Sequence, residues 1–150
     1  MSENETTVNN TEALRTWLLG CPEIAASTGI FGSDYLPDEP GGFTLDSVPS
    51  ALKYRENIVG EMALRPRQEQ LFVLAARMDY GAEALTNLNN LDVFRQIFAW
   101  IIEKNNARDL PAWEGGELTA IVPTLTAYPI SVGSSAARYQ IQVKALYQVG

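Results

Sequence analysis

The chain of 150 residues has the length of one domain, with 46% hydrophobic and 19% charged residues, which argues against low-complexity disorder over most of it. The formal net charge is −7, and the sequence contains no histidine. Ser-His-Asp and Cys-His nucleophile systems, histidine zinc sites and histidine pH switches are therefore excluded.

The cysteine count and the hydrophobic pattern set the expected compartment. Cys21 is the single cysteine, so no intrachain disulfide or CxxC motif can form, and synthesis in a reducing, cytosolic environment is expected. The polar start at residues 1–5 is followed by no hydrophobic run, which predicts no signal peptide. The densest apolar stretch, residues 97–102, is far shorter than the roughly 20 residues that span a bilayer. No membrane partner is expected.

The negative charge is concentrated in the first third of the chain. Residues 1–50 hold eight acidic residues and one basic residue, Arg15, whereas the remaining hundred hold ten of each sign. No basic stripe of the kind that grips nucleic acid is evident. The acidic region is interpreted either as a solvated surface or as a surface that repels DNA passing close by.

The N-terminal half predicts one helix followed by turns. Residues 1–9 are expected to be mobile, and residues 10–150 to form the single domain. A helix over residues 11–19 is indicated by apolar residues at i, i+3 and i+4, namely Leu14, Trp17 and Leu18. Gly20 and Pro22 would end this helix. Cys21 continues that stripe, which favours a buried structural thiol. Residues 22–49 are rich in turn formers, with short extended pieces at 30–31 and 43–45.

A hairpin is predicted next, from an alternating strand over residues 51–58, a bend at Gly60 and a strong strand over residues 69–78. The apolar run at 71–76 is typical of a central strand covered on both faces. Between the strands, Arg65 and Arg67 flank a proline, which suits an exposed edge or loop. This segment is either a solvated turn or a docking point for a carboxylate, because the guanidinium fork binds carboxylates in a bidentate manner.

The C-terminal half predicts one long helix and two strands. Asn90 would cap the helix, whose apolar face is spaced over about three turns: Leu91, Phe94, Ile97, Phe98, Ile101. Residues 118–128 predict an edge strand with a bulge at Pro123, and residues 133–135 a turn. Residues 139–149 alternate strictly, which indicates a half-buried antiparallel strand. The predicted fold is α+β, a central antiparallel sheet with helices packed on one face.

No constellation of residues indicates catalysis. Asp38 and Glu39 are adjacent but would point to opposite sides of an extended backbone, and no DxDxDG loop is present. The three lysines all lie beside polar or charged neighbours, which does not favour a Schiff-base lysine. The expectation is no catalytic residue, no metal ligand and no cofactor.

The order of the later motifs resembles that of the tail terminator, or minor capsid, proteins of tailed bacteriophages and related contractile particles. The resemblance covers about residues 50–150 and rests on these segments in order: 71–78, 79–81, 88–91 leading to Phe94, 98–101, 110–111 and 137–142. It implies a tail-terminator-like fold and a non-enzymatic virion protein of the tail neck, present in the host cytoplasm during assembly.

Further expectations follow from the resemblance. The protein would form a homo-hexameric ring on the last ring of the tail tube, halt tube growth and provide the surface that the head connector or stopper binds. A sheath protein would be a further partner, and DNA would pass through the bore without specific binding. Arg65, Arg67 and Arg138 would be candidates for ion pairs with a neighbouring subunit or tube ring, and Trp113 and Tyr128 for apolar anchors.

Two alternatives remain at this point. One is another neck component, either a connector stopper or a tail-tube subunit. The other is a metal-dependent or ligand-binding domain that uses Asp34, Asp38 and Glu39 around the glycine-rich loop.

Overall fold

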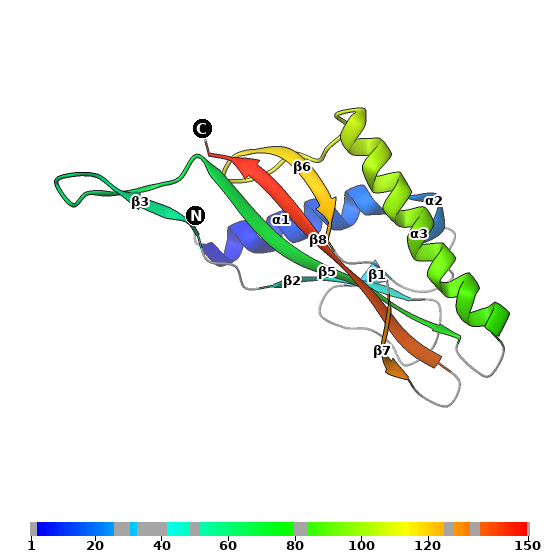
Figure 1. Ribbon diagram of the computed structural model, residues 1–150. Coiled ribbons are helices and arrows are strands. Elements are labelled where there is room, and N and C mark those ends of the chain that lie inside the picture. Colours follow the sequence, from blue (N-terminus) through cyan, green and yellow to red (C-terminus); the bar gives the residue numbers. More distant parts are fainter. Residues whose placement is uncertain are drawn as a thin grey trace.

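The computed structural model describes residues 3–25, 31–32, 42–48, 52–79, 84–124, 128–132 and 136–149. Within these residues the fold is α+β, with three helices, a six-stranded sheet and a separate two-stranded hairpin (Figure 1).

The main sheet has the spatial order β1-β2-β5-β8-β6, and β7 also pairs with β8. Every pairing in this order is antiparallel except that of β1 with β2. The bounds of the strands are β1 Phe31–Gly32, β2 Phe43–Val48, β5 Arg67–Asp79, β6 Glu117–Pro123, β7 Tyr128–Val132 and β8 Ala136–Gln148. The predicted antiparallel sheet is confirmed for β2, β5, β6, β7 and β8, and the parallel strand β1 is a difference from it.

The centre of the sheet is the long ladder between β5 and β8. It runs without interruption from Arg67 opposite Gln148 to Asp79 opposite Ala136. Because side chains alternate along a strand, the ladder places one set of apolar residues on a single face, all of them buried: Phe72, Leu74, Ala76, Tyr139, Ile141, Val143. The predicted central strand and the predicted alternating C-terminal strand are both confirmed. The prediction that the central strand is covered on both faces is wrong, because Leu71 and Val73 on the opposite face are only half-buried.

The helices cover this apolar face. They are α1 Glu3–Leu18, α2 Pro22–Ala25 and α3 Ala84–Asn106. In α3 the ring of Phe94 lies 6.2 Å from that of Phe43 on β2 and 6.3 Å from that of Tyr139 on β8. The two long helices also meet, since the rings of Trp17 and Trp100 are 4.7 Å apart. Trp100, which lies off the main apolar stripe of its helix, therefore contacts α1.

Two buried or half-buried asparagines connect the helices to segments that lack a full set of backbone partners. Asn10 of α1 donates to the carbonyl of Glu114 and accepts from its N–H, at 3.0 and 2.8 Å. In the same way, the Asn105 side chain of α3 donates to the carbonyl of Ile121 in β6 and accepts from the Ile121 N–H, the latter at 2.7 Å. Each side chain thus replaces one rung of a ladder, which satisfies backbone groups that would be costly to bury unpaired.

Three predictions about element boundaries are wrong. The first helix begins at Glu3, so most of the N-terminal segment 1–9 is helical, and Pro22 begins α2, as a proline can at a first helical position. Asn90 lies inside α3 and does not cap it, because good helix formers such as Ala84 precede it. The C-terminal region holds three strands, since β7 separates β6 from β8.

The predicted hairpin is also paired differently. Residues Tyr54–Glu56 (β3) pair with Met62–Leu64 (β4) and not with β5. The apolar run of β5 instead pairs with β2 on one side and β8 on the other, which buries far more apolar surface than a short hairpin strand could. The bend at Gly60 and the exposure of Arg65 and Arg67 are confirmed. The predicted turn at residues 133–135 lies outside the described residues.

We expect Leu74→Ala to lower the free energy of unfolding by about 2–5 kcal/mol, because it leaves a cavity under the central ladder. Leu74 is fully buried, whereas Leu19, after the end of α1, is 39% exposed. The matched change Leu19→Ala should cost less than about 1 kcal/mol. Urea unfolding of both variants checks this, and equal losses would contradict the assignment of the core.

Cys21 is buried, and desolvation raises the pKa of its thiol. The thiolate is the reactive form, so at pH 8 the native protein should react with an aromatic disulfide reagent at least about tenfold more slowly than in concentrated guanidinium chloride. A Cys21→Ala, Ala107→Cys chain, whose thiol would be at an exposed position, should react quickly in both conditions. Rapid labelling of native Cys21 would show that the site is open.

Candidate functional site

A projecting hairpin is the most distinctive surface feature of the described residues. We call residues 53–65 the arm; they contain β3 and β4 and extend away from the sheet and helices at one end of the molecule (Figure 1). The arm leaves the body directly before β5, so its root lies beside the end of the central ladder.

The sequence at the tip of the arm forms a tight turn. The side-chain oxygen of Asn57 accepts from the N–H groups of Val59 and Glu61, both at 3.0 Å, and the Asn57 N–H donates to the Glu61 carbonyl. Gly60 has φ of +86°, a conformation that glycine adopts without steric cost. Asparagine and glycine therefore fix the bend.

The arm exposes an unusual amount of apolar side chain. Ile58 and Val59 at the tip are 104% and 78% exposed, and Met62 is 67% exposed. Tyr54 and Leu64 on the arm are exposed as well. The arm thus holds five of the eight large hydrophobic side chains that are exposed in the described residues. The pairing register places Tyr54, Met62 and Leu64 on one face of the hairpin, together with Glu56, and Arg55 with Ala63 on the other. The arm is thus amphipathic.

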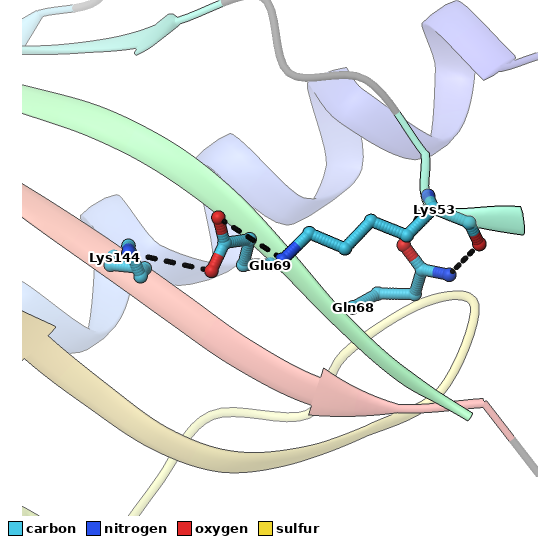
Figure 2. A network of polar contacts seen from close by, with 4 residues as sticks. All are labelled: Lys53, Gln68, Glu69 and Lys144. Atoms are coloured by element: carbon cyan, nitrogen blue, oxygen red, sulfur yellow. Dashed lines mark hydrogen bonds and ion pairs between the residues drawn. The ribbon is translucent and has the colours of Figure 1, made fainter. Parts of the chain in front are cut away.

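A polar network holds the root of the arm (Figure 2). The side chain of Gln68 is buried; its oxygen accepts from the Lys53 N–H at 2.9 Å, and its amide nitrogen donates to the carbonyls of Lys53 and Arg65 at 2.7 and 3.0 Å. Beside it, Glu69 lies between two ammonium groups, 3.5 Å from that of Lys53 and 3.4 Å from that of Lys144. Both strands of the arm are therefore fixed to the central ladder.

Next to the root lies a surface cavity of about 690 Å³, which we call the hollow. It is lined by residues from the segment after α3, from β6 and from the end of β8: Arg108, Leu110, Pro111, Ala112, Trp113, Gly116, Glu117, Leu118, Thr119, Gln148. A smaller cavity that Lys53 and Arg67 line shares Thr119 and Gln148 with it. Gly116 is required in the wall, because a methyl group there would overlap the carbonyl oxygen of Gln148.

Arg108 at the edge of the hollow has a left-handed backbone, with φ of +58°. It ends α3 in a Schellman motif, in which Asp109 N–H donates to the Lys104 carbonyl and Arg108 N–H to that of Asn105. Glycine is the residue that suits this position, and a longer side chain costs of order 1 kcal/mol there. The Arg108 guanidinium donates to the Thr119 carbonyl at 3.0 Å, and no carboxylate of the described residues lies within ion-pair distance of it.

The structure brings together three of the five predicted interface residues. Arg65 is at the root of the arm, where its Nε donates to the Tyr54 carbonyl at 3.2 Å; Arg67 lines the smaller cavity. Trp113 lines the hollow, but its ring also packs edge-on against Phe72 at 6.0 Å, so much of it serves the chain's own core.

The other predicted residues lie apart from this site. Arg138 is opposite Arg77, at the other end of the central ladder, and its guanidinium lies 3.8 Å from the Asp46 carboxylate of the same chain. Tyr128 is the first residue of β7, opposite Gln140. Asp34, Asp38 and Glu39 lie outside the described residues, so the ligand-binding alternative keeps the status of a prediction.

Sequence reasoning missed the apolar tip of the arm. The signal was present, because Ile58 and Val59 stand directly before the bend at Gly60, where polar residues are usual. The prediction instead places Ile58 at the end of a strand over residues 51–58 that pairs with residues 69–78, and gives Val59 no role.

The described residues carry no group of three or more Cys, Asp and Glu side chains arranged to hold a metal ion. None of the helices that the structure describes is long and apolar enough to cross a membrane. Comparison with known proteins finds no family model that matches the chain and no curated protein with significant sequence similarity.

We expect Gln68→Ala to loosen the arm, because it removes three hydrogen bonds that fix the arm's two strands to β5. Trypsin should then cleave after Lys53 or Arg55 several-fold faster, as opening of the root becomes about 1–3 kcal/mol easier. Gln70→Ala, two residues along the same strand, is the matched control. Equal cleavage rates in the two variants would show that Gln68 does not hold the arm.

Trp113→Phe should leave the free energy of unfolding unchanged or raise it by up to about 1 kcal/mol. The indole nitrogen of Trp113 is buried and has no hydrogen-bond partner in the described residues, so its removal relieves a desolvation cost while the ring contact with Phe72 is kept. Trp113→Ala, which removes the ring, should lower the free energy of unfolding by about 3–5 kcal/mol. Chemical unfolding measures both, and a large loss in Trp113→Phe would show that the N–H is satisfied.

Proposed function

We propose that this chain is a structural subunit that works through protein–protein contacts and carries out no chemical reaction. The observation that carries the proposal is the arm, an anchored hairpin with five exposed large apolar side chains. Scattered single apolar residues are ordinary on a protein surface, but a contiguous apolar set marks an interaction site. Anchoring the root also keeps the arm extended before a partner is met, which lowers the entropy cost of binding.

Together with the resemblance of residues 50–150 to tail terminators, this observation favours a role at the end of a phage tail tube. We propose that six copies form a ring on the last ring of the tube, that the ring stops tube growth, and that it offers the head connector or stopper a docking surface. The net charge of −7 suits a ring through which DNA passes, because a basic bore would retain the duplex. The tube protein and, in contractile particles, the sheath would be its neighbours.

A tail-tube subunit is the second candidate, and the arm favours it, since tube subunits polymerise through long hairpins. The β3 and β4 strands are three residues each, which is short for that purpose. The tail terminator therefore remains our proposal.

Deleting the gene and imaging the particles tests the proposal. Loss of a terminator should give tubes of uncontrolled length or tails without heads, and a plasmid-borne copy should restore normal particles. Absence of all tubes would identify a tube subunit instead, and normal tails carrying heads would refute both assignments.

A further inference from the structure

We propose that the arm of one copy of this chain is seated in the hollow of the next copy. This deepens the proposed function, on which it rests, because it names the two surfaces through which subunits would join. The partner is a second copy of the same chain, and the association is head to tail.

The arm lacks the packing that such a hairpin needs. A lone two-stranded hairpin is only marginally stable in water, and stability normally comes from a third strand or from a surface packed against one face. The apolar face formed by Tyr54, Met62 and Leu64 is exposed, as are Ile58 and Val59. A second protein surface against this face and the tip would supply the missing burial.

The hollow has the size and the chemistry to receive the tip. Its volume of about 690 Å³ accommodates the two tip side chains with their turn, and Leu110, Pro111 and Trp113 provide apolar walls. The acidic residues that flank the tip, Glu56 and Glu61, would find a positive rim.

The rim is positive because of how its charges are paired. Among the charged residues that line the hollow and the adjoining cavity, Lys53 and Glu69 form an ion pair with each other. The other charged lining residues are two positive ones, Arg67 and Arg108, and one negative one, Glu117. A strained backbone at a surface position is a reason to look for a function of the side chain, and Arg108 holds its guanidinium at the rim at such a cost. We assign to it the contact with the acids of the neighbouring arm.

The placement of the two surfaces requires a contact between two chains. The arm extends away from the body, so its tip lies far from the hollow of its own chain, which adjoins the root (Figure 1). Two different patches that complement each other generate rings when the rotation closes and filaments when it does not. The arrangement therefore fits a closed ring such as the proposed function needs.

Cysteine cross-linking between two singly substituted chains tests the contact. Both chains carry Cys21→Ala; one also carries Ile58→Cys at the tip, and the other Ala112→Cys in the hollow. Mixed under mild oxidation, they should form a disulfide-linked dimer of the two different chains at least about tenfold faster than a control pair in which Ala99→Cys, at an exposed position of α3 outside the hollow, replaces Ala112→Cys, because docking raises the effective concentration of the two thiols. Circular dichroism confirms that each chain is folded.

A dominant link between two copies of the Ile58→Cys chain would show an arm-to-arm contact and overturn the proposal. A rate equal to that of the control pair would overturn it as well. Either result leaves the gene-deletion phenotype as a separate test, so failure of the arm-to-hollow contact is distinguishable from failure of the proposed function.

Arg108→Gly separates the contact from the fold. Glycine relieves the left-handed backbone, so thermal stability should be kept or raised, whereas the rate of cross-linking between the tip and the hollow should fall at least about fivefold as the charge contact is lost. Introducing Glu56→Lys into the tip chain with Arg108→Glu in the hollow chain should restore much of the rate. An undiminished rate in Arg108→Gly would overturn the role of this residue.

Discussion

The uninterrupted antiparallel ladder between β5 and β8 is the constraint on which the rest of the structure depends. Its two strands of 13 residues each place their apolar side chains on the same face, so that one continuous surface is available for the helices. A slip of one residue would move all of these side chains to the opposite face, and the buried layer formed by Phe94 of α3 against Tyr139 would be lost. Strands β2, β6 and β7 pair directly with β5 or β8, so their positions follow from this register.

Polar side chains bind the backbone of segments that lie outside the central ladder. Asn10, Gln68 and Asn105 each use both ends of an amide group to bind backbone N–H and C=O groups of a segment outside the central pairing. A neutral amide both donates and accepts, so it can replace a ladder rung without bringing a charge into the core. In this way the segment at Glu114, the edge strand β6 and the root of the arm are tied to the body.

The arm and the hollow are the two surface features that differ from the buried core. The arm leaves apolar groups exposed at the end of the molecule where the central ladder ends, and the hollow beside its root combines apolar walls with an arginine held at a backbone cost. The exposed side chains of the arm are not packed against the rest of the chain. These two surfaces are the observations from which we propose that copies of this chain associate.

The amino-acid sequence by itself determined the elements with strong local periodicity. The alternation at residues 139–149 and the i, i+3, i+4 spacing of Leu14, Trp17 and Leu18 each set a face, because period 2 and period 3.6 are properties of the backbone alone. The continuous apolar run at 71–76 indicated a central strand but not which of its faces would be the more deeply buried. The edge position of β6 and the exposure of Arg65 and Arg67 were also predictable, since proline cannot donate to a ladder. The predicted place of the bulge was wrong, because the register of β6 shifts between Leu118 and Ala120, whereas Pro123 is paired with Val143.

Only the tertiary structure decided which strands pair and which side chains gather. Strand β5 pairs with β8 and β2 and not with the hairpin before it. This choice depends on which segments, far apart in the chain, bury the most apolar area together, and a local sequence pattern contains no information on that. The same choice leaves residues 53–65 without a partner strand from the main sheet and places their root beside Arg108 and Trp113, more than 40 residues away in sequence. The candidate site is thus a consequence of long-range packing, whereas the elements that build it are consequences of local sequence.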